Sequence, residues 1–484
     1  MGDKRAAVLA IDQGTTNSKA ILVDEDGAVL ATGSAPVGLT TPRPGWAEQD
    51  AGELWSSVLS AVHHCLGAAD AHVVAVAVTN QRESVVGWRR DTGHPLGPII
   101  GWQDIRTAAW CETLPAATRD LARERTGLQV DAMYSAPKIR WLLEESGGAD
   151  LLVGTVDSWL VWKLTGGRRH LAEAGNASRT LLYDVIDHDW SPALLDAFGV
   201  PRGVLPDVVP SNGDFGTTSG VPGLRDGLPV TAVLADSHAA LYGQGCTRTG
   251  MAKATYGTGT SVMTPVEKFD PAHTAVPVTL AWMTDRPLFA REGNIVSSGA
   301  ALAWTASTLG LDGVGELVAA AATVPGSGGV TLVPAFSGLG APHWERNARA
   351  AFTGMTSGTT RAHLARAAVD AVAHQVCDLA EAIEATGITL RLLRADGGAS
   401  ASGLLMQTQA DLLGRPVEVA GVAEISALGV AELAWKSLGS PTDWAARRTP
   451  ARVFEPEVDD AARAQRRTDW AAEVAAVRAR ARGQ

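Results

Sequence analysis

The stretch AIDQGTTNSKAILVDEDG, residues 10–27, decides the fold, because it sets a tight polar turn between two apolar runs. The runs at 6–11 and 18–24 read as two β-strands. The Asp-Gly pair that closes the stretch leads into a third strand, since Asp-Gly between apolar runs is a strong hairpin signal. The turn at 12–16 gathers a carboxylate, backbone amides and two hydroxyls. Such groups suit a phosphate and its metal, although polar residues also fill ordinary surface hairpins.

Length and composition are typical of a two-domain globular protein. The chain has 484 residues, and a single hydrophobic core rarely grows past roughly 250–300 residues. Hydrophobic residues make up 46% and charged residues 19%, which is ordinary for a folded protein. The formal net charge of −11 argues against a general nucleic-acid or acidic-membrane binder, which needs a basic face. We therefore expect small-molecule ligands, with no nucleic-acid and no membrane partner.

The cysteines and the N-terminal sequence favour a cytoplasmic protein. The four cysteines form no C-x-x-C pair and are far apart, which excludes a zinc ribbon and a disulfide framework and predicts reduced, buried thiols. The first residues lack the long apolar stretch and cleavage site of a signal peptide. No apolar run reaches the roughly 18 residues that a membrane helix needs.

Beyond the opening stretch, strands and helices are expected to alternate. The spacing of apolar residues predicts a helix over 52–66, a buried strand over 72–84 and a hairpin over 85–104. The strand delivers Asn-Gln-Arg-Glu at its end. Further helices are expected at 115–126, 135–146, 156–164 and 460–482, the last as a solvated surface helix, and 200–229 is expected to be rich in loops.

The second half restarts this architecture in outline. A strand, an aspartate and a small-residue helix are expected over 228–245, followed by two strands around a Gly-Thr-Gly turn over 251–265. The similarity is one of pattern, not a repeat of fixed period. We therefore divide the chain into a first domain at 1–245 and a second at 246–484.

Three glycine-rich turns follow predicted strands, at 12–16, 256–260 and 396–403. One such turn is weak evidence of a site, since glycine simply permits tight geometry. Three of them, spread over both halves, indicate a cleft in which two domains grip one phosphorylated ligand. The sequence has no G-x-x-x-x-G-K-[ST], which excludes a P-loop enzyme. No G-x-G-x-x-G opens a helix after a first strand, which weakens a dinucleotide-binding interpretation.

Eight motifs occur in an order that resembles the FGGY carbohydrate kinases, and most of all their glycerol kinase branch. They are DQGTT, NQRES, GWQD, TVDSWLVWKLTG, NASRT, YGTG, PAFSGLGAPHW and DGGASASGLLMQ. MYSAPKIRWLLEE at 133–145 and AAFTGMTSGTTRAHLARAAVD at 350–370 resemble the two family signatures. The resemblance runs from about residue 6 to about residue 440. It implies an actin- and hexokinase-like (ribonuclease H-like) α/β fold with a deep cleft between two domains, and an ATP-dependent kinase for a small polyol or sugar.

The resemblance also implies which residues bind ATP and Mg²⁺. In the first domain Asp12 helps to hold the metal, directly or through water, and Gly14, Thr15, Thr16 and Lys19 line the phosphates. The residues implied in the second domain are Gly257, Thr258 and Gly259 in the matching turn, and Gly299, Gly398 and Ser402 beside the nucleotide. Glycerol kinases tend to have Asn where this chain has Ser402, so the adenine contact of this residue stays open.

Asp236 is the expected general base and the second carboxylate beside the metal. Phosphoryl transfer needs in-line positioning, charge neutralisation and a group that orients and deprotonates the attacking hydroxyl. A carboxylate at the end of a strand that opens onto the cleft suits that task. Taken alone, Asp236 could merely cap a helix that starts near Ser237. The family motif around it favours catalysis.

A second polar group, Arg82 with Glu83, lies at the end of the predicted strand at 72–84. At the end of a strand these residues could form an ordinary surface ion pair. The resemblance implies instead that they bind substrate hydroxyls, with Arg82 donating and Glu83 accepting. Trp102 would then provide an apolar wall.

Three substrate-facing positions depart from the glycerol kinase pattern. Met133-Tyr134 stands where that branch usually has Tyr-Phe, and Ser237-His238 follows the catalytic aspartate in place of Gln-Gln. Ser261 stands where that branch usually has Phe. The smaller and more polar side chains predict a C4 or C5 polyol or ketose as the substrate rather than glycerol. In the alternative, other side chains refill the pocket and the protein is a true glycerol kinase.

A non-catalytic actin-like ATP-binding module is a further alternative. The retained Asp12, Arg82, Glu83 and Asp236 argue against it, because a nucleotide switch needs no polyol site. A homodimer is possible by family resemblance. Some glycerol kinases have a Gly-Gly-Lys-Gly-Gly-type loop linked to control by a sugar bisphosphate, and 211–226 contains no clear match to it.

Overall fold

The opening stretch forms the predicted hairpin at the centre of a five-stranded sheet. The computed structural model of the chain describes residues 4–147 and 150–483. Across the sheet the strands are β13 (Val230–Ala235), β5 (Ala71–Asn80), β1 (Arg5–Gln13), β2 (Asn17–Val23) and β3 (Val29–Pro36). β1 pairs antiparallel with β2, whereas β5 and β13 continue the sheet as parallel strands. The carboxyl ends of β1, β5 and β13 therefore meet at one edge.

Helices cover both faces of this sheet, and one of them comes from the far end of the sequence. α1 (Ala51–Ala68), which Asp50 caps, packs on β2 and β3. α13 (Ile425–Ser437) packs on β1, β5 and β13. Leu9 and Ile11 lie in the core under α1, while Val8 and Ala10 lie in the core under α13. This alternation is the two-residue period of a strand that is buried on both faces.

The second sheet repeats the first in outline, as the sequence predicts. β14 (Met251–Tyr256) and β15 (Thr260–Val266) form an antiparallel hairpin, and β20 (Leu392–Asp396) runs parallel to β14. The order is β16-β17-β15-β14-β20-β21-β22, with the outer strands β16 (Val278–Met283), β17 (Pro287–Ile295), β21 (Val417–Val419) and β22 (Arg452–Phe454). Its helices are α9 (Gly299–Thr308), α10 (Gly313–Ala321), α11 (Arg361–Glu384), α12 (Gly403–Leu413) and α15 (Asp460–Ala481).

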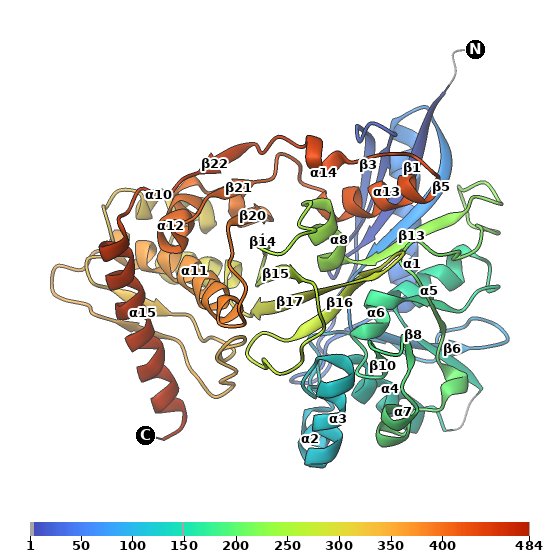
Figure 1. Cartoon of the computed structure of the whole chain (residues 1–484), viewed down its shortest axis with the longest axis horizontal. Coiled ribbons are helices and arrows are strands. Elements are labelled where there is room, and N and C mark those ends of the chain that lie inside the picture. The colour runs from blue at the N-terminus through green and yellow to red at the C-terminus, as the bar shows by residue number, and fades with distance from the viewer. Residues whose placement is uncertain (1–3, 148–149, 484) are drawn as a thin grey trace.

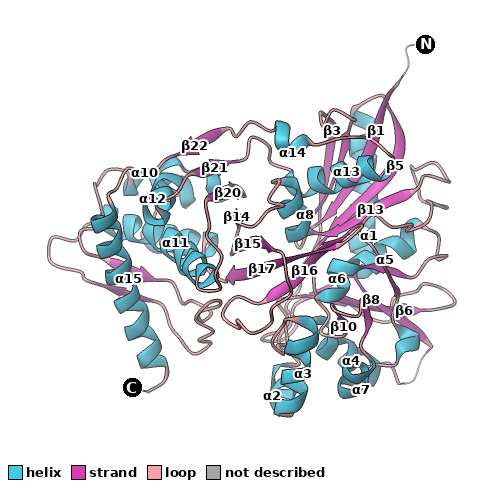
Figure 2. Cartoon of the chain, viewed as in Figure 1, coloured by secondary structure: helices cyan, strands magenta, loops and turns pink. Residues whose placement is uncertain are grey.

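The two sheets organise two lobes, which Figure 1 shows at the right and the left (Figures 1 and 2). A smaller sheet in the order β4-β7-β6-β8 and a group of short helices extend the first lobe. Their bounds are β4 (Glu48–Gln49), β6 (Val85–Arg89), β7 (Ile99–Ile100), β8 (Leu151–Thr155), α2 (Ala108–Thr113), α3 (Ala116–Thr126), α4 (Ser135–Glu145), α5 (Val156–Leu164), α6 (Ala174–Ser178), α7 (Pro192–Phe198) and α8 (Asp236–Gly243).

The remaining elements are short. β9 (Leu171–Glu173) pairs with β12 (Asp207–Val209), so the loop-rich stretch at 200–229 contains one brief strand. The other short elements are β10 (Tyr183–Asp184), β11 (Asp189–Trp190), β18 (Thr331–Val333), β19 (Ala351–Thr353), α14 (Trp444–Arg447) and the 3₁₀ turns Arg202–Val204 and Gly398–Ala401.

The C-terminal helix α15 has a buried face, which the sequence analysis did not anticipate. Trp470, Val474 and Val477 pack into the core of the second lobe. Trp470 also donates from Nε1 to both carboxylate oxygens of Asp378 on α11, at 3.0 Å. The prediction of a solvated surface helix is therefore wrong for one side of α15. Its apolar residues are few, but they lie on one stripe that faces the core.

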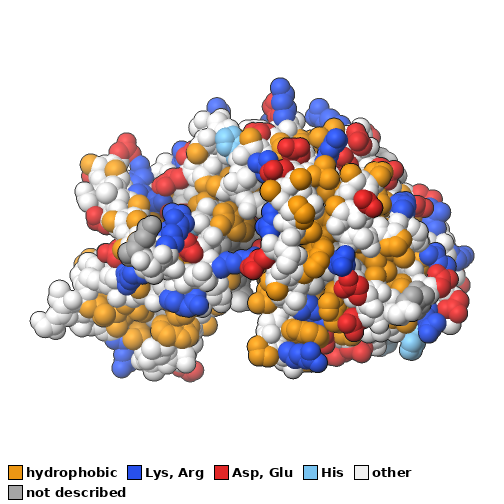
Figure 3. Space-filling view, turned by 90° about the horizontal axis from the view of Figure 1, so that it is seen from below, with side chains coloured by type: hydrophobic (Ala, Val, Ile, Leu, Met, Phe, Trp, Pro, Cys, Tyr) orange, Lys and Arg blue, Asp and Glu red, His pale blue; other side chains and the backbone are white. Residues whose placement is uncertain are grey.

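The surface seen from below is notched between the two lobes, with acidic and basic side chains beside the notch (Figure 3). All four cysteines are free and buried, as predicted. Among the described residues, no helix combines the length and the apolar character needed to cross a membrane.

Candidate active site

The register of the first sheet brings the polar sequence motifs of the first lobe together. Gln13 on β1 and Ala235 on β13 both pair with Asn80 on β5, so the three strands end level with one another. Asp12 lies near the end of β1, and Arg82 is the second residue after β5. Asp236 is the first residue after β13. Because polar side chains beyond the carboxyl ends of parallel strands share one crevice, this edge is the natural site for a ligand.

The turn between β1 and β2 is a tight loop closed by its own backbone. Gly14 donates its N–H to the carbonyl of Asn17 at 3.0 Å. The Thr15 hydroxyl accepts a hydrogen bond from the indole of Trp102 at 3.0 Å, and Thr16 is exposed. Lys19 on β2 instead binds the carboxylate of Glu424, at 2.9 and 3.1 Å. The predicted phosphate-binding lysine is therefore held by an acidic side chain from the loop before α13.

Carboxylates crowd together beside this turn. Burial and the nearby carboxylate of Asp236 raise the pKa of Asp12 to about 7, Lys19 opposes this rise, and Glu424 adds to it. A divalent cation would relieve the repulsion. Mg²⁺ is usually held by one or two carboxylates together with phosphate oxygens and water. Asp12 and Asp236 fit that role, and among the described residues no group of three or more metal-binding side chains competes with them.

The second lobe forms a cradle of glycines in which backbone meets backbone. A Cβ on Gly299, at the start of α9, would lie 2.3 Å from the carbonyl oxygen of Gly257. A Cβ on Gly259 would lie 2.4 Å from the carbonyl oxygen of Ile295, and one on Gly397 would lie 2.5 Å from that of Tyr256. No side chain fits at these three positions. The turn that includes Thr258 is thus packed directly against the first turn of α9 and the loop after β20.

Gly398 and Ser402 lie in the same loop but differ in what they can offer a nucleotide. A Cβ on Gly398 would meet no atom of the described residues within 4 Å, so its backbone borders open space. The Ser402 hydroxyl accepts from the N–H of Leu405 at 3.2 Å and caps α12. This structural use accounts for a serine at the position without any contact to adenine.

Asp236 lies at the start of α8, with its side chain 38% exposed toward the crevice. Its carboxylate accepts the N–H of the adjacent Ser237 at 2.6 Å. A conventional cap residue precedes the helix and binds an N–H two or three residues on, so Asp236 is not a simple cap. Burial raises its pKa, while Arg82, whose Nε lies 3.4 Å from Oδ1, lowers it.

Arg82 and Glu83 belong to a buried cluster of four charges that joins the two lobes. Arg82 donates through both terminal nitrogens to Glu292 on β17, at 2.6 and 2.8 Å. Arg179 donates to Glu83 at 2.7 Å and lies 3.1 Å from Glu292. Although burial alone would raise it, these two guanidinium groups hold the pKa of Glu292 well below its usual range.

This cluster fixes the predicted substrate-binding pair. The two terminal nitrogens of Arg82 are bound by Glu292, which leaves its Nε to face Asp236 and the crevice. Glu83 has a positive φ of 60°, an unusual backbone conformation for a residue with a long side chain. Its carbonyl oxygen accepts from Lys138 and Ser135 on α4, which hold the turn in place. Trp102 is 37% exposed, and its backbone N–H donates to Ser84 at 3.1 Å.

The three positions that depart from the glycerol kinase pattern surround this cluster. The Ser261 hydroxyl lies 3.4 Å from both Glu292 and the ammonium of Lys253. The Tyr134 ring lies 5.2 Å from the guanidinium of Arg179. Met133 is half-buried, and its carbonyl oxygen accepts from Lys138. Ser237 is also half-buried, next to Asp236.

Sequence reasoning missed four charged residues at this site: Glu292, Arg179, Lys253 and Glu424. Arg179 lies within the NASRT motif, so the sequence pointed to this position, but no role was assigned to the arginine. Lys253 comes four residues before the Gly-Thr-Gly turn, and burial lowers its pKa. Glu292 and Glu424 lie outside the motifs that we singled out. Their partners are remote in the chain, which no local pattern reveals.

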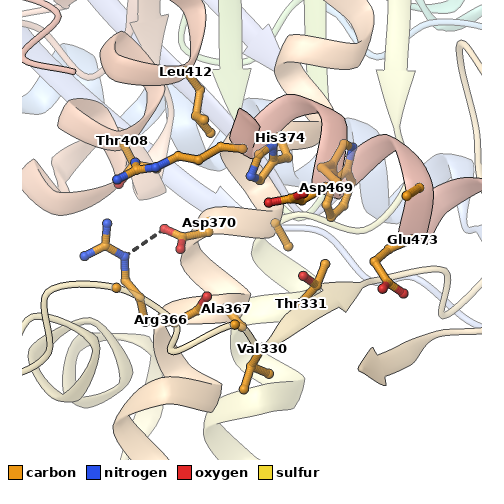
Figure 4. Close-up of a pocket in the computed structure, with 17 residues that line it drawn as sticks. Val330, Thr331, Arg366, Ala367, Asp370, His374, Thr408, Leu412, Asp469 and Glu473 are labelled. Carbon is orange, nitrogen blue, oxygen red and sulfur yellow. Dashed lines mark hydrogen bonds and ion pairs between the residues drawn. The ribbon is translucent and has the colours of Figure 1, made fainter. Parts of the chain in front are cut away.

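A cavity of about 490 Å³ in the second lobe contains none of the predicted site residues. It lies between α11, α12, α15 and the loop before β18 (Figure 4). Arg366 donates to Asp370 across one wall at 2.7 Å. His374 stacks on Trp470 with ring centroids 4.9 Å apart and has a ring nitrogen 3.0 Å from Arg467.

His374 is expected to make the folded protein less stable in mild acid. Burial lowers the pKa of His374 to about 3, so the unfolded chain binds a proton near pH 6.5 that the folded protein does not. Stability is therefore lost as the pH falls below about 6.5, by about 2 kcal/mol between pH 7 and pH 5 from this residue. Urea unfolding of wild type and His374→Gln at both pH values measures the difference. His63→Gln, on the exposed side of α1, should keep the full wild-type loss, and an unchanged loss in His374→Gln would contradict the assignment.

Comparison with known proteins agrees with this geometry. The N-terminal domain of the FGGY family of carbohydrate kinases matches residues 7–243, and its C-terminal domain matches 252–438. The chain is 44% identical over 482 residues to a glycerol kinase of Alkalilimnicola ehrlichii, covering 96% of this chain and 97% of that one. It is 43% identical over 488 residues to an apulose kinase of Pectobacterium atrosepticum, covering 98% of each.

Solved structures show the same fold. The glycerol kinase of Plasmodium falciparum with ADP superposes with a TM-score of 0.91 at 28% identity, covering 99% of both chains. A xylulose kinase of Rhodospirillum rubrum gives 0.88 at 26% identity, covering 98% of this chain and all of that one. The chain therefore belongs to the FGGY family of carbohydrate kinases and is an ATP- and Mg²⁺-dependent phosphotransferase that acts on alcohol groups.

Proposed function

We propose that this kinase transfers the γ-phosphate of ATP to a terminal hydroxyl of a C4 or C5 polyol or ketose in preference to glycerol. The observation that supports the proposal best is the polar surface around Glu292. Ser261 and Lys253 lie beside the carboxylate there, and no aromatic side chain stands at position 261. A three-carbon substrate would leave these polar groups bound only to one another, whereas a longer substrate with further hydroxyls could form additional hydrogen bonds with them.

In the proposed reaction Asp236 orients the attacking hydroxyl and accepts its proton. Its raised pKa brings the carboxyl closer to the working pH, which favours a general base. Arg82 would donate from Nε to a substrate oxygen, because its other nitrogens are held by Glu292. Mg²⁺, when bound with ATP, neutralises charge on the phosphates. Asp12 and the two glycine turns would then align the γ-phosphate with the hydroxyl.

The roles of the individual nucleotide-binding residues belong to the same proposal. Gly14, Thr15 and Thr16 would bind phosphate from the first lobe, and the Gly257–Gly259 turn with Gly299 from the second. Lys19 reaches phosphate only if it leaves Glu424, to which it is bound by two hydrogen bonds. Such an exchange would place the lysine on the nucleotide and free Glu424 beside the metal.

Glycerol phosphorylation is the second candidate function, because several relatives at 43–44% identity are glycerol kinases. An apulose kinase at 43% identity shows that proteins equally similar to this chain include a kinase with a different substrate name. Identity at this level therefore does not choose between the two candidates. The side chains around Glu292 favour the longer substrate.

Initial rates with a panel of acceptors test the choice. We expect kcat/KM for the best tetritol, pentitol, ketotetrose or ketopentose, with apulose included, to exceed that for glycerol by about ten-fold, the scale of one or two lost contacts in a pocket. ADP release coupled to NADH oxidation measures every acceptor in the same way. Glycerol kinase from another source serves as the control for the assay. A higher kcat/KM for glycerol than for every longer acceptor would refute the preference and leave glycerol as the substrate.

A further inference from the structure

His238 is a fully buried histidine, and within residues 4–147 and 150–483 neither of its ring nitrogens has a hydrogen-bond partner. It lies on α8, two residues after Asp236. A neutral imidazole has one N–H donor and one acceptor nitrogen, and in folded proteins buried polar atoms nearly always find partners. Two unmatched atoms on one buried ring therefore call for a physical explanation.

The surroundings of the ring join it to the substrate-binding cluster. The charged side chains that act on it are Arg82, Glu292, Arg179 and Lys253. Burial, reinforced by the arginines, lowers the pKa of His238 well below its usual value, so the ring is neutral. Three of these four residues also lie against Asp236 or against Ser261, and Ser261 is one of the altered positions of the pocket.

The fold makes room for this ring on its other side. A Cβ on Gly175 would lie 3.0 Å from Nδ1 of His238 and 2.7 Å from the carbonyl oxygen of Ala281. Any other residue at position 175 would clash with the carbonyl oxygen of Ala281 and press against both the imidazole and the carboxylate of Glu173. Gly175 and the unmatched ring of His238 therefore lie side by side, next to the groups that are predicted to bind hydroxyls.

A purely structural role explains this arrangement poorly. An aliphatic side chain would fill the volume beside Ala281 without leaving polar atoms unmatched, and would be the more stable choice. Water could satisfy the ring, but an ordered water beside a substrate pocket marks the place where a substrate oxygen can bind instead. The unmatched nitrogens therefore point to a ligand atom.

We propose that His238 is a specificity-determining residue that hydrogen-bonds an oxygen of the substrate which glycerol lacks. The inference rests on the proposed function and deepens it: the substrate is a polyol or ketose whose fourth or fifth carbon carries a hydroxyl or whose chain carries a carbonyl oxygen. The reacting hydroxyl lies at Asp236, and the remainder of the chain extends past Arg82 and Ser261 to the imidazole.

Two substitutions at this position separate hydrogen bonding from packing. His238→Leu removes both polar atoms, and His238→Gln keeps one donor and one acceptor. The quantity measured is the selectivity ratio, kcat/KM for the best C4 or C5 acceptor divided by kcat/KM for glycerol. We expect His238→Leu to lower this ratio by at least about ten-fold, and His238→Gln to lower it less. The midpoint of thermal unfolding of His238→Leu without ligands should equal or exceed that of wild type.

His374→Leu provides the matched control, because His374 is also a buried, neutral histidine on a helix, but one with a hydrogen-bond partner and remote from the site. It should lower the unfolding midpoint and leave the selectivity ratio unchanged. An unchanged ratio in His238→Leu, or an equal loss of turnover on all acceptors together with a lower unfolding midpoint, would overturn the inference.

The experiment distinguishes failure of the inference from failure of the proposed function. The ranking of acceptors by the wild-type enzyme tests the proposed function alone. The change in the ratio on substitution tests His238, even if glycerol ranks first. Where an acceptor gives no measurable turnover, the increase in the unfolding midpoint that this acceptor causes is measured in place of kcat/KM. It is compared with the increase that glycerol causes. Loss of selective protection in His238→Leu then supports the inference, and its persistence refutes it.

Discussion

Replacing Asp236 by asparagine is expected to lower kcat by about 10²-fold or more, the usual scale for removal of a general base. The substitution keeps the size of the side chain and an oxygen that can accept the N–H of Ser237, so the start of α8 should be preserved. Asparagine cannot take the proton from the attacking hydroxyl. The fold and nucleotide affinity should be retained, because the glycine turns of both lobes are untouched.

Single-turnover kinetics with saturating acceptor and ATP measure this effect on the chemical step. Nucleotide titration followed by intrinsic tryptophan fluorescence checks that binding survives. Asp189→Asn, at an exposed position on β11, is the matched control and should leave both quantities at wild-type values. A rate for Asp236→Asn near that of wild type, with chemistry rate-limiting, would show that another group accepts the proton.

Glu292→Gln is expected to have the largest effect on stability, a loss of about 3–5 kcal/mol in the free energy of unfolding, the range for a broken buried ion pair. Glu292 binds Arg82 through both carboxylate oxygens and lies 3.1 Å from Arg179, and all three side chains are buried. Glutamine offers one acceptor and no charge. Two guanidinium groups would then be left with too little compensation away from water.

Urea denaturation followed by circular dichroism measures this loss. Asp207→Asn is the matched control, because it removes the same charge from an ion pair with Arg202 in which Asp207 is 79% exposed. Exposed pairs contribute about 0–1 kcal/mol, so this variant should unfold close to the wild-type midpoint. Equal losses in the two variants would mean that the charges around Glu292 are solvated and that the cluster does not join the lobes.

Features set by neighbouring residues were predictable from the sequence. The hairpin around DQGTT follows from two alternating runs and an Asp-Gly turn, and its match in the second half follows from the same signals. Helices at 116–126 and 135–145 differ from the predicted ranges by one residue at an end. The edge at which Asp12 and Asp236 meet follows from parallel strands, whose carboxyl ends share one side of a sheet.

Features set by distant partners were not predictable in this way. Arg82 and Glu292 are 210 residues apart, and their pairing depends on how two lobes dock. Lys19 and Glu424 are 405 residues apart. The placement of α13 on the first sheet could not be predicted for the same reason. Its apolar residues predict a buried helix, but they do not indicate which surface covers it. Packing of the whole chain decides these contacts.

The position of α13 has a mechanical consequence. In the part of the chain that the structure describes, the backbone passes between the lobes three times, near Gln244, near Gly421 and near Thr449, and all three passages line one small cavity of about 180 Å³. Connections gathered at one place act as a single pivot. We expect any movement of one lobe relative to the other to be a rotation about that place, and such a movement would have to separate Arg346 of the second lobe from Asp131 of the first. Opening of the cleft to substrate is therefore expected to be a hinge rotation about the three connections rather than a separation of the lobes.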